Sequence, residues 1–139
     1  MQWNETILSQ MSSRARHETI GARDWLLNHQ NLASPFMHAI TTTHPAIWVG
    51  EVFESIAGEI ANQNPIAIEL GCLFIIEDPK SPFGRIMKRK VLNALRRNSK
   101  LIQNQYERPL RAAFERMQGL PYPPQELKDF ARLIRVLAT

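Results

Sequence analysis

The chain has 139 residues, of which 44% are hydrophobic and 22% charged, and its formal net charge is +4 at pH 7. This composition excludes extensive disorder, and the length predicts a single domain over residues 1–139. The sequence patterns described below predict that this is a single helical domain. The single cysteine, Cys72, excludes an internal disulfide and a zinc site built from several cysteines. No apolar segment reaches the ~20 residues that cross a bilayer, and no secretory leader is recognised, so we expect a cytoplasmic protein with no membrane partner.

Helices are predicted from the N-terminus onward, and prolines mark several of their starts. A short helix is predicted from Asn4, and a second runs from Ser12 to about His29. A third is predicted from Pro35 to Thr42 and a fourth from Pro45 to Gln63. Proline is well placed at the first helical position, because its missing N–H would have no partner within the helix.

The segment Pro65 to Asp78 is the most apolar in the chain. Its apolar residues spread around the whole helical wheel, and only Glu69 interrupts them. Such a helix must be covered on nearly every side, so it is predicted to be the buried centre of the fold. A carboxylate in this helix could act as a general acid or base, or it could simply pair with an arginine.

The second half continues the helical pattern. A basic amphipathic helix is predicted from Pro82 to about Asn98, with Ser81 as its N-cap. The next helix is predicted from Lys100 to Gln118, where Pro109 should kink it or split it in two. A last helix is predicted from about Pro124.

About eight short antiparallel helices result, and no stretch shows the alternation of a strand. The segment Glu77 to Leu95, EDPKSPFGRIMKRKVLNAL, contains an Asp-Pro turn, then a basic residue, then small and aliphatic residues. It resembles the turn and second helix of a HEAT repeat, and Pro109 is similar to the proline that kinks a HEAT first helix. The resemblance implies an all-α protein stacked as a right-handed α-solenoid-like array of the HEAT or armadillo type.

Charge is distributed unevenly along the chain. Residues 1–78 contain 3 Lys and Arg against 9 Asp and Glu, whereas residues 79–139 contain 14 against 4. Between Asp78 and Glu107 there is no acidic residue. This basic segment predicts a surface for an anionic partner, formed by Arg85, Lys88, Arg89, Arg96, Arg97 and Lys100.

Two interpretations of the basic surface remain open. It could neutralise the phosphates of a nucleic acid, which is a sequence-independent and salt-dependent mode of binding. Alternatively, the acidic helix Pro45 to Gln63 lies beside the basic helix in a helical stack. The positive charges of the basic helix then pair internally with Glu51, Glu54 or Glu59. Exposed pairs of this kind contribute at most about 1 kcal/mol each.

Motifs for catalysis or for a cofactor are not found. The four histidines lack the i, i+4 spacing of a helical metal site, and the chain has no nucleotide-binding loop or nucleophile elbow. We therefore expect no cofactor and no metal. Trp3, Trp25 and Trp48 all lie in the acidic half, where they either anchor an interface or cap the end of the helical stack.

Three functions follow, in order of preference. The first is a protein-interaction module or adaptor that binds a protein partner, with self-association of the unlike halves as one form of it. The second is binding of a nucleic-acid backbone by the basic helix at residues 82–100. The third is an enzyme of unknown class, for which no catalytic residue is identified.

Overall fold

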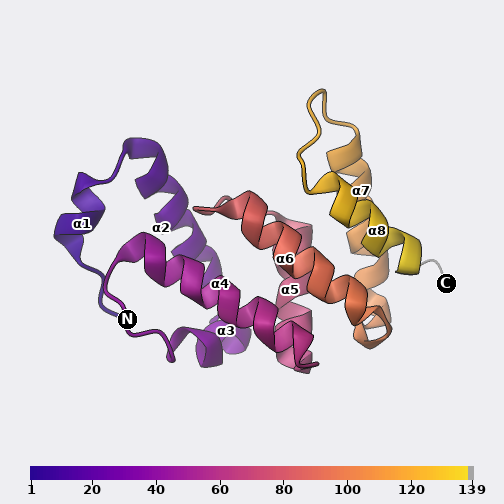
Figure 1. Ribbon diagram of the computed structural model, residues 1–139, viewed down its shortest axis with the longest axis horizontal. Coiled ribbons are helices and arrows are strands. Elements are labelled where there is room, and N and C mark those ends of the chain that lie inside the picture. The colour runs from indigo at the N-terminus through magenta and orange to yellow at the C-terminus, as the bar shows by residue number, and fades with distance from the viewer. Residues whose placement is uncertain (138–139) are drawn as a thin grey trace.

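The computed structural model describes residues 1–137, which form helices and connecting turns without any strand (Figure 1). Eight α-helices are present in this part: α1 (Glu5–Gln10), α2 (Ser13–Asn28), α3 (Gln30–Met37), α4 (Pro45–Ala61), α5 (Pro65–Glu77), α6 (Gly84–Arg97), α7 (Glu107–Gln118) and α8 (Leu127–Leu137). Two 3₁₀ turns, η1 (Ser99–Leu101) and η2 (Asn104–Tyr106), join α6 to α7. The all-helical class predicted from the sequence is therefore confirmed.

Helices α4 and α5 begin as the sequence predicts, with proline at the first helical position. The side chain of Asn64 caps α5, since its Oδ1 accepts hydrogen bonds from the backbone N–H of Ile66 at 3.0 Å and of Ala67 at 3.4 Å. Asp78 ends the same helix in a left-handed conformation, with φ of 50°. Local capping signals therefore define both ends of the central helix.

The prediction for α3 is wrong at both ends. The helix runs from Gln30 to Met37, so Pro35 lies inside it instead of starting it. Ala33, Phe36 and Met37 are buried on one face at i, i+3 and i+4 spacing. We attribute this placement to the burial of that face, which outweighs the single backbone hydrogen bond that Pro35 cannot donate.

Later boundaries also differ from the prediction. Helix α6 begins at Gly84, because Phe83 adopts a left-handed conformation and the Oγ of Ser81 forms no hydrogen bond with any described residue. Pro109 is the third residue of α7, where its missing N–H costs nothing, so it causes no kink. The break falls earlier, at the extended backbone of Ile102 and Gln103. The last helix begins at Leu127.

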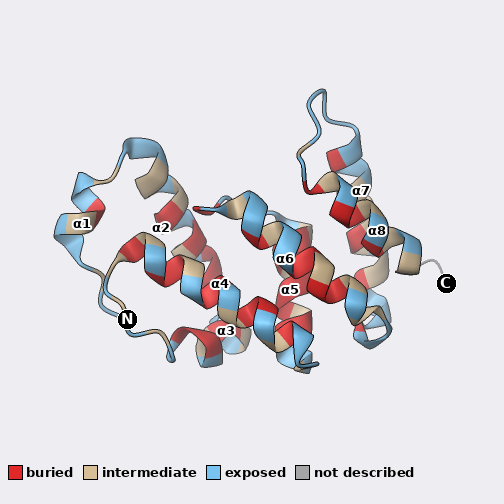
Figure 2. Ribbon diagram, viewed as in Figure 1, coloured by how far each residue is buried: buried red, intermediate tan, exposed pale blue. Residues whose placement is uncertain are grey.

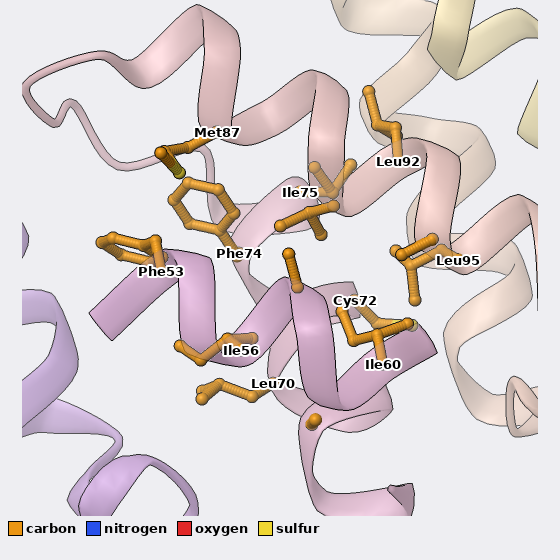
Figure 3. Packing of buried hydrophobic residues seen from close by; sticks show 14 of the residues in the cluster. Phe53, Ile56, Ile60, Leu70, Cys72, Phe74, Ile75, Met87, Leu92 and Leu95 are labelled. Carbon is orange, nitrogen blue, oxygen red and sulfur yellow. The ribbon is translucent and has the colours of Figure 1, made fainter. Parts of the chain in front are cut away.

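The core is built around α5, as its apolar sequence predicts. Most positions of this helix are buried, and α4 and α6 both pack against it. Figure 2 shows buried positions on all three helices. Phe53 of α4 and Phe74 of α5 meet with ring centroids 4.5 Å apart, beside Met87 of α6 (Figure 3). One cluster of buried hydrophobic residues continues from Ala22 to Leu133.

Helices two positions apart in the chain lie side by side. Contacts join α2 to α4, α4 to α6 and α6 to α8, and a second set joins α3 to α5 and α5 to α7. In Figure 1, α4 and α6 cross the molecule next to each other, and α5 packs behind them. No helix in the described part is both long enough and apolar enough to span a bilayer.

Candidate functional site

The six residues of the predicted basic surface lie on α6 and on η1, and three of them line two separate cavities. Five of its residues lie on α6, whereas Lys100 lies in the turn η1 and lines a separate cavity of about 420 Å³. Arg85 and Lys88 line a second cavity, at the start of α6. Arg96 is half-buried, and its Nε is enclosed without a hydrogen-bond partner in residues 1–137. The structure therefore does not gather all six cations into one stripe.

Three cations of α6 form ion pairs with three different neighbours. Lys88 pairs with Asp78, the residue that ends α5, and Lys90 pairs with Glu54 of α4. The Nε of Arg89 donates a hydrogen bond to Oδ2 of Asp129 in α8 at 2.8 Å. Part of the positive charge of α6 is thus neutralised within the protein.

Internal pairing was only partly visible in the sequence. Glu54 is one of the three acidic residues predicted to face the basic helix, but within the described chain Glu51 and Glu59 form no ion pair. Asp78 and Asp129 were missed as partners. No local pattern identifies Asp129, because it lies 40 residues beyond Arg89.

A cavity of about 500 Å³ opens where α6 begins, and we call it the α6 groove. Its residues come from α2, from the segment before and within the first turns of α6, and from the segment before α8. They are Arg14, Glu18, Lys80, Ser81, Phe83, Gly84, Arg85, Ile86, Lys88, Gln125 and Glu126.

The chain enters α6 through an unusual backbone conformation. Phe83 has φ of 59° and ψ of 26°, in the left-handed region that a bulky residue rarely adopts. Phe83 is 60% exposed, and Ile86, in the first turn of the helix, is 54% exposed. Two large apolar side chains therefore stand in solvent at the groove.

Polar groups in the α6 groove lack partners although they are buried. Ser81 and Glu126 are only 6% and 5% exposed. The Oγ of Ser81 and the Oε2 of Glu126 form no hydrogen bond with any described residue. Such groups cost free energy when they are left unpaired, so their presence in one cavity marks it as a place where a ligand could bind.

Charge in the groove is predominantly positive. Four cations and two carboxylates line it. Arg14 pairs with Glu18, and Lys88 pairs with Asp78 just outside the lining. Lys80 and Arg85 form no ion pair in the described chain, which leaves two cations available to a ligand.

A second polar cluster surrounds Glu69, a half-buried residue of α5. The hydroxyl of Tyr106 donates a hydrogen bond to Oε1 of Glu69. Burial, followed by this hydrogen bond, raises the pKa of Tyr106 to about 12. Burial, together with repulsion from Glu69, raises the pKa of Cys72 to about 12. Glu69 thus anchors η2 to α5, and a protonated buried thiol is a poor nucleophile.

A third polar cluster joins α2 to the end of α5. The indole N–H of Trp25 donates a hydrogen bond to Oε1 of Glu77 at 2.8 Å, and Nε2 of His29 lies 2.7 Å from the same oxygen.

The other two tryptophans contact each other. Trp48 is buried, and Trp3 packs edge-on against it with ring centroids 5.7 Å apart. Trp3 and Trp48 therefore pack together near the N-terminus, whereas Trp25 reaches α5.

No protein-family model matches the chain, and comparisons with curated proteins and with solved structures likewise give no match.

Proposed function

We propose that this protein is an interaction module that binds a short acidic segment of another protein in the α6 groove. The observation that carries the proposal is that two exposed apolar side chains and two cations without an ion pair line the same cavity. Apolar contacts of this size supply binding free energy, and the cations select an acidic partner.

The arrangement of the helices supports this function. We infer that α2, α4, α6 and α8 form one layer and α3, α5 and α7 a second, as in a solenoid-like array. The contacts between helices two positions apart support this arrangement. Each layer would hold its helices in a fixed register, so the groove would be a rigid site that loses little entropy on binding.

Nucleic-acid binding is the competing function. Arg85, Arg96, Arg97 and Lys100 form no ion pair in the described chain, so they could contact phosphates. Against this function, Lys88, Arg89 and Lys90 are already paired with carboxylates. The exposed apolar side chains of the α6 groove also have no role in sequence-independent phosphate contacts.

A displayed library of random peptides, selected on the whole protein, tests the proposal. We expect the selected peptides to be rich in Asp and Glu, with an apolar residue nearby. The double variant Phe83→Asn, Ile86→Gln should weaken them at least about tenfold, because it removes the apolar contacts. Asparagine is chosen at position 83 because it tolerates the left-handed conformation.

The matched control is Ile47→Gln, which removes an exposed apolar side chain from α4, away from the groove lining. It should change the affinity less than about twofold. Selected peptides that bind both variants equally well would contradict the proposal. A single-stranded oligonucleotide that binds more tightly than every peptide, and loses affinity in Arg96→Gln, Arg97→Gln, would replace it with the nucleic-acid function.

A further inference from the structure

We propose that the α6 groove recognises a phosphorylated serine or threonine within the bound segment, with the phosphate held at the start of α6. This inference rests on the proposed function, since it names the residue that anchors the acidic segment. It is carried by four groups of the groove: two backbone N–H donors, a buried hydroxyl, two unpaired cations and a buried carboxylate oxygen.

The first group is the set of free backbone donors at the helix start. The N–H of Gly84 donates to the carbonyl of Ser81 at 3.0 Å, and that of Met87 donates to the carbonyl of Phe83. Between them, the N–H groups of Arg85 and Ile86 have no acceptor in the described chain. Both residues line the groove, and α6 has 14 residues, so its dipole adds to their attraction for an anion.

The second group is the unpartnered hydroxyl of Ser81. A Cβ placed on Gly84 would come within 3.3 Å of its Oγ, so this oxygen stands over the first residue of the helix. It caps no backbone N–H, although the N-terminus of a helix is where a serine hydroxyl usually does so. As an O–H donor it would complete, with the two amides, a set of three neutral donors for one anion.

The third group is the pair of unpaired cations, Lys80 and Arg85. A phosphate monoester carries a charge of about −1.5 to −2 at pH 7 and three acceptor oxygens, whereas a side-chain carboxylate carries −1 and two. Three neutral donors and two cations therefore match a phosphate monoester better than they match Asp or Glu.

The fourth group, Glu126, distinguishes a phosphopeptide from a free phosphate. Its Oε2 is buried and unpartnered, and a carboxylate oxygen can only accept hydrogen bonds. Phosphate ion at neutral pH offers it mainly repulsion. A peptide offers a backbone N–H beside the phosphorylated residue, and this N–H would satisfy Glu126 while the phosphate lies at the helix start.

The test compares peptides of one selected sequence that carry phosphoserine, serine or glutamate at the same position. Fluorescence anisotropy with the whole protein should show phosphoserine binding at least about tenfold more tightly than either of the others. The variant Ser81→Ala should reduce this preference at least about fivefold, and Arg85→Gln should do the same. Arg97→Gln, on the same helix but outside the groove, should leave it unchanged.

Glu126→Leu provides the sharper comparison between two ligands. Both lose a repulsive charge, but only the phosphoserine peptide also loses an acceptor for its backbone N–H, so the peptide should weaken relative to inorganic phosphate. Binding of inorganic phosphate is followed through the amide NMR signals of Arg85 and Ile86. Melting temperatures of all variants should be recorded, and Ser81→Ala should melt like the parent because its hydroxyl has no partner to lose.

Failure of this inference can be told apart from failure of the proposed function. Serine and phosphoserine peptides that bind equally, and still depend on Phe83 and Ile86, would overturn the phosphate site while supporting the interaction module. A phosphoserine preference that Ser81→Ala leaves intact would also overturn it. If none of the three peptides bound the protein, both proposals would be overturned.

Discussion

Cys72 and Tyr106 show how strongly the centre of this fold disfavours charge. Each has a pKa raised to about 12, chiefly because burial penalises the ionised form. Glu69 lies beside both of them and adds to the effect. The unfolded chain would ionise these groups near their ordinary pKa values of 9.0 and 10.0.

The stability of the protein should therefore depend on pH in the alkaline range. Because the folded-state pKa values are raised, the contribution to stability is complete below pH 9 and is lost as pH rises toward 12. Urea denaturation at pH 7, 9, 10 and 11 should show the free energy of unfolding falling by an amount on the order of a few kcal/mol. In Cys72→Ala the fall should be smaller and begin near pH 10. Identical pH profiles for the two proteins would contradict the buried-thiol interpretation.

Gly71 is a second residue whose identity is set by packing. A Cβ at this position would lie 2.6 Å from Cδ1 of Ile60 and 3.3 Å from Cγ1 of Val91, so α4 and α6 approach α5 closely here. At Gly50 of α4, no atom counted from residues 1–137 lies within 4 Å of such a Cβ. Alanine substitutions at these two positions therefore compare the cost of overfilling a close contact with the gain in helix propensity.

Gly50→Ala should raise the free energy of unfolding by about 0.5–1 kcal/mol, because alanine favours the helix. Gly71→Ala gains the same propensity but overfills the contact between three helices, and we expect a net loss of about 1 kcal/mol. Chemical denaturation of both variants decides the matter. A Gly71→Ala protein as stable as Gly50→Ala would show that α4 and α6 can move apart freely.

Among the elements, α6 forms ion pairs with α4, with the end of α5 and with α8. Its pair with α8 differs from the pair of Lys90 with Glu54, because the side chain of Asp129 is only 4% exposed whereas that of Arg89 is 54% exposed. The pair between Lys90 and Glu54 lies at the surface, with both side chains about half exposed. Burial of one partner makes the α6–α8 pair the more costly one to break.

Arg89→Met should therefore destabilise the protein by about 1–3 kcal/mol, since within the described residues it leaves the buried carboxylate of Asp129 paired with Arg132 alone, 3.8 Å away. Lys90→Met, a change of the same kind one residue along the helix, should cost less than about 1 kcal/mol. Thermal melts at low and high salt provide the measurement. Equal losses in the two variants would mean that the pair with Asp129 is solvated like a surface pair.

For the whole molecule, two of the three ion pairs of α6 connect the acidic half of the chain to the basic half. They are those of Lys88 with Asp78 and of Lys90 with Glu54. The uneven charge of the sequence is thus partly compensated within the fold. What remains uncompensated includes Lys80 and Arg85 in the α6 groove, which is why this surface, and not the whole basic helix, is proposed to bind a partner.

The central position of α5 predicts that the fold depends on its buried face. Ile68 is buried and Ile66, two residues earlier, is exposed. Ile68→Asp should prevent folding, because an unpaired buried carboxylate costs several kcal/mol, which is comparable to the stability of a whole domain. Ile66→Asp introduces the same group into solvent at the helix start and should fold normally. Circular dichroism and size-exclusion chromatography compare the two, and a folded Ile68→Asp protein would contradict a core centred on α5.

Local signals in the sequence determined the helical class, the starts of α4 and α5 and the burial of α5. Proline at the first helical position, an asparagine cap and an apolar helix are effective because their physics acts within a few residues. The boundaries of α3 and α6 were missed for the complementary reason. At Pro35 the burial of a face overrides a local breaker, and at Phe83 the fold holds a conformation that the residue itself disfavours.

The candidate site depended on tertiary structure in a stronger sense. The sequence identified a basic segment containing Arg85 and Lys88, but its own residues could not show which cations remain unpaired. That outcome depends on Asp129, which the fold brings to α6 from 40 residues away. The groove likewise combines residues near positions 14, 80–88 and 125, and its unpartnered groups exist only once burial has removed water from them. The sequence by itself determines which residues are charged, whereas packing between distant segments determines which charges are neutralised or removed from water.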